Sequence, residues 1–154
     1  MQSVQLERCS NAVPLQIDNT DAEGRLILAD ALCYADTFSP RLVLDIATLT
    51  GAMSVALGTA ATGVFCTRTA DFGALEECGR ATGDRVWRMP LWQHYTDKMK
   101  VSQLADLNNA PVGGGGACTA AAFLRLLRDG SWCIGVFVFV CLCICIYICV
   151  FVFE

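Results

Sequence analysis

The sequence predicts an α/β domain, in which helices flank a β-sheet. Short apolar runs rich in β-branched residues alternate with amphipathic segments, which is typical of this class. In addition, 55% of the 154 residues are hydrophobic, enough for one domain with a buried core. We assign residues 1–131 to this domain and residues 132–154 to a separate apolar tail of low complexity.

Helical and strand patterns alternate in the first half of the chain. Apolar residues at helical spacing predict a helix over residues 20–37, with Leu28, Leu32 and Ala35 on one stripe. Residues 41–48 and 62–67 are apolar and β-branched, and they predict buried strands. Residues 70–82 return to helical spacing and end at Gly83, a residue favoured just after a helix.

The pattern is less regular in the second half. Residues 94–100 predict a short helix, and residues 102–109 predict a strand that leads into the glycine loop 113–116. Residues 117–128 are rich in Ala and Leu and predict another helix. We expect Trp87, Met89 and Trp92 to pack in the core or at an interface.

Charge and cysteine content restrict the function. A net charge of -4 and a pI near 4.9 leave no basic stripe for nucleic acid, so that partner is excluded. Residues 1–14 lack the apolar core of a signal peptide, and we expect a reducing, cytoplasmic compartment. Five single cysteines lack metal-site spacing and are interpreted as small buried hydrophobic residues: Cys9, Cys33, Cys66, Cys78 and Cys118.

The apolar tail differs in composition from the rest of the chain, because residues 132–153 contain no charged side chain. Three interpretations stay open. The first in order of preference is a translated short nucleotide repeat, since Val, Ile, Phe and Cys alternate almost regularly. The second is a membrane span, through which residues 133–153 alone would contact a bilayer. The third is a buried or aggregation-prone strand.

Residues 19–26, NTDAEGRL, carry the residue types of a metal site. Asp21, Glu23 and Arg25 could point the same way from a partly extended segment before a helix. Two carboxylates could then hold a divalent metal and the guanidinium an anion beside it. Gly24 costs about 1 kcal/mol relative to Ala in a first turn, which indicates close approach of a group to the backbone. The alternative is a capping box, in which Thr20 and Glu23 only start the helix.

Other catalytic sites are excluded by residue type. His94 is the only histidine, so this chain cannot supply an HExxH zinc site or a Ser-His-Asp triad, and His94 is interpreted as an ordinary residue. The four glycines at 113–116 lack the Lys and Ser or Thr that complete a phosphate-binding P-loop. Asp21, Glu23 and Arg25 therefore remain the candidate chemical groups.

The segment NTDAEGRL resembles the signature octapeptide of the leucine aminopeptidase family, also called cytosol aminopeptidases. Six further segments stand in that family's order and approximate spacing: ILADALCYA, ATLTGAM, ATGVF, TGDRVWRMPLW, QLADLNN and GACTAAAFLR. The resemblance covers residues 13–128. It implies a fragment of the family's catalytic domain, with a mixed sheet flanked by helices.

The resemblance also implies site residues and cofactors. Asp21 and Glu23 match metal-coordinating carboxylates, with Glu23 bridging two ions, either Mn²⁺ or Zn²⁺. Arg25 matches the catalytic arginine, which holds bicarbonate or polarises the tetrahedral intermediate. Positions that line the family's substrate site match Thr48, Leu49 and Gly51.

The implied activity is release of N-terminal amino acids, leucine preferred, from peptides by two-metal hydrolysis in a homo-hexamer. The family's domain begins with a segment that supplies a metal-binding lysine, further aspartates and a second catalytic lysine, and this chain has no counterpart. We therefore expect the chain alone to be weakly active or inactive. Two alternatives are a non-catalytic subunit in a hetero-hexamer with a full-length relative and a membrane-anchored fragment.

Overall fold

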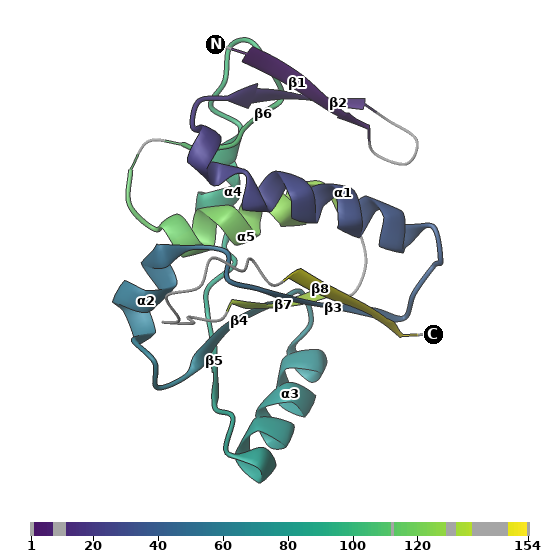
Figure 1. Ribbon diagram of the computed structural model, residues 1–154, viewed down its shortest axis with the longest axis vertical. Coiled ribbons are helices and arrows are strands. Elements are labelled where there is room, and N and C mark those ends of the chain that lie inside the picture. The colour runs from purple at the N-terminus through teal and green to yellow at the C-terminus, as the bar shows by residue number, and fades with distance from the viewer. Residues whose placement is uncertain (1, 8–11, 112, 129–131, 137–147, 154) are drawn as a thin grey trace.

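A computed structural model describes residues 2–7, 12–111, 113–128, 132–136 and 148–153 (Figure 1). The strands are β1 (Gln2–Glu7), β2 (Ala12–Ile17), β3 (Leu42–Ala47), β4 (Thr62–Cys66), β5 (Val86–Arg88), β6 (Leu107–Asn108), β7 (Trp132–Val136) and β8 (Ile148–Phe153). The 3-10 helix η1 is Thr20–Ala22, and the α-helices are α1 (Gly24–Asp36), α2 (Gly51–Leu57), α3 (Thr69–Thr82), α4 (Gln93–Met99) and α5 (Gly116–Leu126).

The main sheet has five strands in the order β5-β4-β7-β3-β8. Strand β4 is parallel to β5 and antiparallel to β7, while β3 is parallel to β7 and antiparallel to β8. Figure 1 shows α1 and α5 on one face of this sheet and α3 on the other. The prediction of a mixed sheet flanked by helices is therefore confirmed.

A second, smaller sheet carries the chain into the candidate site. It has the order β1-β2-β6, with β1 antiparallel and β6 parallel to β2. Strand β2 leads directly into η1 and α1, which hold the NTDAEGRL segment. Strand β6 lies beside β2 and brings residues near position 108 to the same turn.

The hydrophobic core follows the two faces of the main sheet. The larger cluster joins Leu28 and Leu32 of α1 to Phe123 of α5 and to the sheet. The smaller cluster joins Val64, Cys66 and Cys133 to side chains of α3. In β3 burial alternates along the strand, whereas every residue of β4 is buried. Apolar and β-branched residues thus cover both faces of β4, as expected for a strand inside a sheet.

Most predicted elements are confirmed with small shifts. The predicted helix 20–37 is α1, but it begins at Gly24 because η1 occupies residues 20–22. Helix α3 ends at Gly83, whose φ of 82° is the left-handed conformation expected after a helix. The predicted strand 102–109 is reduced to the two residues of β6. Elements that the pattern did not indicate are β1, β2, α2 and β5. Of these, β1 and β5 lie at sheet edges and α2 is short, whereas β2 is the middle strand of the smaller sheet.

The described parts of the tail belong to the main sheet. Strand β7 lies between β4 and β3, and β8 pairs with the other edge of β3. The strand interpretation, the least favoured of the three, agrees with the described residues, while the origin of the tail as a translated repeat stays a prediction. Residues 137–147 lie outside the described residues. Within the described part of the chain, every helix falls short of the length and apolarity that crossing a bilayer takes.

The expectation that Trp87 and Trp92 pack in the core is wrong, because they are 63% and 67% exposed, whereas Trp132 is 1% exposed. The packing of Trp87 and Trp92 at an interface stays a prediction. Trp92 directly precedes α4 and stacks on Tyr95 with ring centroids 6.3 Å apart. His94 is exposed, as expected of an ordinary residue.

The cysteines fall into three groups. Cys33 and Cys118 are buried and form no disulfide among the described residues, which confirms their interpretation as small hydrophobic residues. Cys78 is exposed, so that interpretation is wrong for it. Cys66 is buried but forms a disulfide with Cys133, which the separation of 67 residues gave no means to predict. Cys9 lies outside the described residues.

Candidate active site

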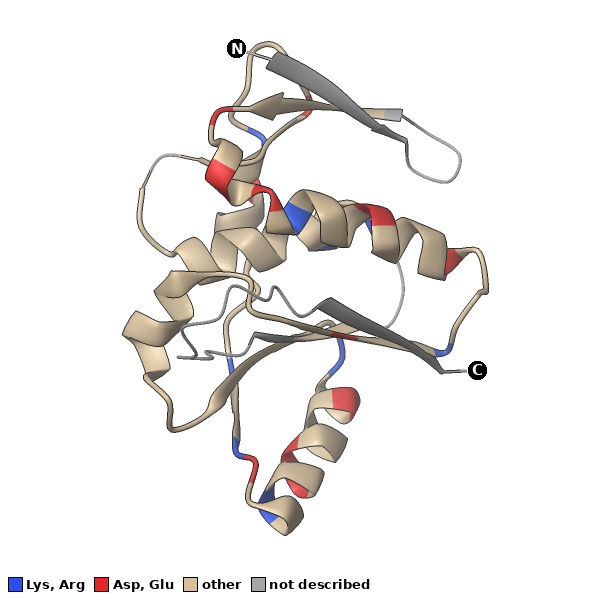
Figure 2. Ribbon diagram, viewed as in Figure 1, with Lys and Arg blue, Asp and Glu red and all other residues tan. Residues whose placement is uncertain are grey.

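A cavity of about 320 Å³ lies between the start of α1 and the loop that follows β3. It brings together all six residues that the resemblance implied: Asp21, Glu23, Arg25, Thr48, Leu49 and Gly51. Figure 2 shows acidic residues at η1 and before α1, next to a basic residue in the first turn of α1. Two segments that the rest of α1 and most of β3 separate in the sequence therefore form one concave, charged surface.

The two carboxylates are not used to start the helix. The side chain of Asn19 caps η1 by accepting a hydrogen bond of 2.9 Å from the backbone N–H of Asp21. Glu23 is the residue before α1 and makes no side-chain capping bond, so the predicted capping box does not form. Asp21 is exposed and Glu23 is half-buried. Both carboxylates therefore remain accessible from the cavity.

Arg25 lines the same cavity as the two carboxylates and is held there by a hydrogen bond. Its side chain is buried, with the residue 9% exposed, and its Nη1 donates a hydrogen bond of 2.8 Å to the backbone carbonyl of Asn109. Burial lowers the pKa of this guanidinium below its ordinary value. Arginine nevertheless stays charged at neutral pH, and its guanidinium has further N–H donors for an anion.

Asn109 organises the turn before α1, and the search for site residues in the sequence missed it. It is fully buried. Its Oδ1 accepts from the backbone N–H groups of Asp18 and Asn19 at 2.9 and 3.3 Å, and its Nδ2 donates to the Asn19 carbonyl at 2.6 Å. The side-chain amide of Asn109 therefore fixes the turn, and the backbone carbonyl of the same residue fixes Arg25. In the sequence, the segment QLADLNN contributed only to the family resemblance. The role of Asn109 in it depends on a contact with Arg25, which is 84 residues away in the sequence.

Asp18 is occupied by structural hydrogen bonds. Its two oxygens accept from Gln16 Nε2 at 2.8 Å and from Asn108 Nδ2 at 2.5 Å. These two bonds lower the pKa of the Asp18 carboxyl, in that order of effect. Gln16 in turn accepts a hydrogen bond of 2.6 Å from Ser102. Asp18 thus joins β2 to the segment around β6 rather than facing the cavity.

The opposite wall is the loop from Thr48 to Gly51, between β3 and α2. Thr48 and Leu49 are half-buried, and Gly51 is exposed at the start of α2. A Cβ added to Gly24 would lie 3.7 Å from Leu49 Cδ1, which is ordinary contact. The expected close approach of another group to the Gly24 backbone is therefore not found among the described protein atoms.

Asp21 and Glu23 fit part of a metal site. Carboxylate oxygens suit Mn²⁺ and Zn²⁺, and these two line the cavity without a side-chain capping bond. The described residues contain no cluster of three or more His, Cys, Asp or Glu side chains able to hold a metal ion. Among the described residues, Asp21 and Glu23 are therefore two candidate ligands, fewer than the about four or more that a protein metal site usually has.

Comparison with known proteins agrees with this geometry. A family model for the cytosol aminopeptidase family, catalytic domain, matches residues 6–133. Cytosol aminopeptidase of Homo sapiens is 60% identical over 119 residues, covering 77% of this chain and 23% of the human protein. That of Dictyostelium discoideum is 50% identical over 125 residues, covering 80% of this chain and 24% of its own length.

A solved structure gives the same result. A mutant of tomato leucine aminopeptidase matches with a TM-score of 0.78 and 42% sequence identity, covering 82% of this chain and 25% of that one. The chain therefore spans about a quarter of the length of the relatives that it matches. On these grounds, the chain belongs to the cytosol aminopeptidase family, within its catalytic domain.

Proposed function

We propose that this chain forms part of a metal-dependent aminopeptidase that releases N-terminal amino acids, leucine preferred, by two-metal hydrolysis. The observation that carries the proposal is the cavity lined by Asp21, Glu23 and Arg25 on one side and the Thr48–Gly51 loop on the other. The family membership supports it, because the relatives are named as aminopeptidases.

Each wall of the cavity has a separate task in this proposal. Asp21 and Glu23 hold divalent cations, which when bound would activate water and polarise the peptide carbonyl. Arg25, fixed by the Asn109 carbonyl, places a permanent positive charge where negative charge develops in the transition state. Leu28 and Leu49 provide apolar surface in the same cavity, which suits a leucine side chain.

Metal binding is the first test, because it does not require a complete active site. Two carboxylates bind a divalent cation weakly, with a dissociation constant on the order of 1 mM. Titration with Mn²⁺, followed by electron paramagnetic resonance, measures the free ion directly. We expect Asp21→Asn and Glu23→Gln each to weaken binding at least about tenfold, since each removes a ligand charge.

A matched control separates this site from general acidity. Glu77 is exposed on α3, on the opposite side of the sheet from α1 (Figure 1). Glu77→Gln removes the same charge as Glu23→Gln and is expected to leave Mn²⁺ binding unchanged. Equal binding by wild type, Asp21→Asn and Glu23→Gln would contradict the proposal.

The catalytic part is tested with a leucyl amide substrate and Mn²⁺ or Zn²⁺. We expect little or no turnover by the chain alone, because the described residues supply only two carboxylate ligands. Any turnover should disappear in Asp21→Ala. Turnover that survives this substitution would refute the assignment of the site.

The presence of only two candidate metal ligands among the described residues, Asp21 and Glu23, also favours a second function, that of a non-catalytic subunit. In that case the chain would enter a hexamer of a full-length relative and lower its activity. Mixing experiments distinguish the two, since co-purification with loss of leucyl amide hydrolysis supports the subunit. Added activity, sensitive to Asp21→Ala in this chain, supports the enzyme.

A further inference from the structure

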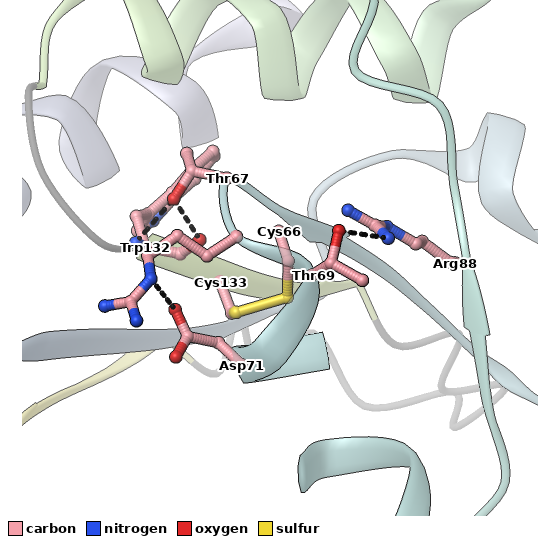
Figure 3. The surroundings of a disulfide bond; sticks show 8 residues. Cys66, Thr67, Thr69, Asp71, Arg88, Trp132 and Cys133 are labelled. Atoms are coloured by element: carbon pink, nitrogen blue, oxygen red, sulfur yellow. Dashed lines mark hydrogen bonds and ion pairs between the residues drawn. A yellow bond between two sulfur atoms is a disulfide. The ribbon is translucent and has the colours of Figure 1, made fainter. Parts of the chain in front are cut away.

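The geometry points to a second site, independent of the proposed metal site: a small anionic thiol binds beside the Cys66–Cys133 disulfide and opens it reversibly by thiol–disulfide exchange. Figure 3 shows this disulfide between β4 and β7, with Thr67, Thr69 and Arg88 close by. The cavity concerned lies away from Asp21 and Glu23 and shares no lining residue with theirs.

The two cysteines occupy a position where a cross-strand disulfide forms readily. Cys66 and Cys133 face each other in the antiparallel register of β4 and β7, with their Cα atoms 4.2 Å apart. The Thr67 N–H donates to the Trp132 carbonyl at 2.9 Å, which makes the next pair, 66 and 133, the non-hydrogen-bonded one. Cα atoms are closest in such pairs. Oxidation therefore needs no change in strand pairing.

The two cysteines differ in access. Cys66 is 5% exposed and is one of the residues that line a cavity of about 480 Å³, whereas Cys133 is 0% exposed and is not among them. A volume of this size accommodates a small peptide. An incoming thiol therefore meets Cys66 first, and Cys133 is the leaving group.

The positive charge of this cavity favours an anionic thiol. Its lining residues include two cations, Arg88 and Arg125, beside an apolar wall of Met89, Pro90, Leu91 and Trp92. Both guanidiniums are held in place, since Arg125 donates to the Leu91 carbonyl at 2.9 Å and Arg88 donates to Thr69 Oγ1 at 3.1 Å. Among the described residues neither forms an ion pair with a carboxylate. They are thus available to the carboxylates of a thiol-containing peptide.

The exchange proceeds in two balanced steps. A thiolate attacks Cys66 Sγ, the disulfide bond breaks, and Cys133 leaves as a thiolate that takes a proton from water. A second thiolate then attacks the sulfur of the bound thiol, which releases a small disulfide and leaves Cys66 as a thiol. The reverse steps, with the small disulfide as oxidant, restore the bond. Intracellular disulfides are commonly of this reversible, redox-sensing kind, which fits the cytoplasmic compartment expected from the sequence.

The test compares thiols of opposite charge on the intact, oxidised chain. Glutathione is anionic and cysteamine is cationic, and both rates are normalised to the concentration of thiolate. Alkylation and peptide mass mapping follow Cys66 and Cys133 over time. We expect glutathione to open the bond about tenfold faster, because two cations concentrate an anion in the cavity. We also expect the glutathione adduct on Cys66.

Substitutions test whether the cavity causes the faster reaction with glutathione. Arg88→Gln and Arg125→Gln should each reduce the preference for glutathione severalfold, and the double variant should abolish it. Arg80→Gln, which removes an exposed charge paired with Glu76 on α3, is the matched control and should keep it. Cys133→Ser has no disulfide, so it is loaded with oxidised glutathione: the Cys66 thiolate attacks the small disulfide, forms the mixed disulfide and releases one glutathione thiolate. In this variant the adduct on Cys66 should persist, since no internal thiol can displace it.

Four results would overturn the inference. Free thiols at Cys66 and Cys133 in chain purified without reductant would show that the bond does not form. Equal rates for the two thiols would remove the role of the arginines, and an adduct on Cys133 would contradict the unequal access. Exchange only in denaturant would show that the cavity does not admit a thiol. The wild-type rates decide these points even if Cys133→Ser fails to fold.

Discussion

The carboxyl group of Asp45 predicts an unusual dependence of stability on pH. Asp45 lies within β3, on the same face as Val43 and Ala47, and is fully buried. Neither carboxylate oxygen has a hydrogen-bond partner among the described residues. Burial penalises the ionised form and raises the pKa of Asp45 from 3.8 to about 7.

The direction and size of the effect follow from this pKa. The unfolded chain loses the Asp45 proton near pH 4, whereas the folded chain keeps it until about pH 7. The folded state therefore holds the extra proton between these values, and the free energy of unfolding falls as pH rises from about 4 to about 7. The pKa values differ by about three, and each unit equals about 1.36 kcal/mol, so the loss is about 4 kcal/mol at pH 8.

Asp45→Asn isolates this contribution, because the amide is similar in shape and does not ionise. At pH 4 both side chains are neutral, and we expect the two proteins to have similar free energies of unfolding. At pH 8 the variant should be more stable by about 4 kcal/mol. Urea denaturation between pH 4 and pH 8, followed by circular dichroism, measures the difference at each pH.

Subtracting the two curves removes the titration of every other group. A difference that stays constant between pH 4 and pH 8 would refute the raised pKa. A variant that is less stable than wild type at pH 8 would refute the reasoning as well, since it would mean that the ionised carboxylate has a favourable partner in the folded chain.

Further predictions concern α3 and the turn before α1. Gly79→Ala should lower the free energy of unfolding by about 1–3 kcal/mol, because the new Cβ would lie 2.5 Å from the Asp84 carbonyl oxygen. Gly73→Ala, in the same helix with no atom within 4 Å of the new Cβ, should raise it by about 0.5–1 kcal/mol, and equal effects in thermal unfolding would contradict this contrast. Asn109→Ala should cost about 2–3 kcal/mol, because it removes the acceptor of two partly buried hydrogen bonds from the N–H groups of residues 18 and 19, and faster hydrogen exchange at these two residues checks it. Unchanged exchange there would show that Asn109 does not hold the turn.

Elements with strong local patterns could be predicted from the sequence. The stripe of Leu28, Leu32 and Ala35 gives α1, and Gly83 gives the end of α3. These features depend on residues a few positions apart, so periodicity and terminal residues suffice. Strands β1 and β5 lie at sheet edges and β6 has only two residues, and their existence depends on a partner from elsewhere in the chain.

The candidate site divides in the same way. The residue types of Asp21, Glu23 and Arg25, and their spacing, indicated a metal and anion site, and the structure places them on one cavity. The alternative capping box could not be excluded from sequence, because Asn19 and Thr20 are both good capping residues. The choice of Asn19 depends on the turn, which Asn109 holds from 90 residues away.

Sequence alone therefore determined the family, the local elements and the chemical groups of the proposed metal site. Only the tertiary structure placed Asn109 under Arg25, paired Cys66 with Cys133 and left Asp45 buried without a partner. The physical reason is the separation in sequence between the residues that determine each feature. Helix and strand patterns are set by neighbouring side chains, whereas hydrogen bonds, disulfides and burial depend on which distant segments the sheet brings into contact.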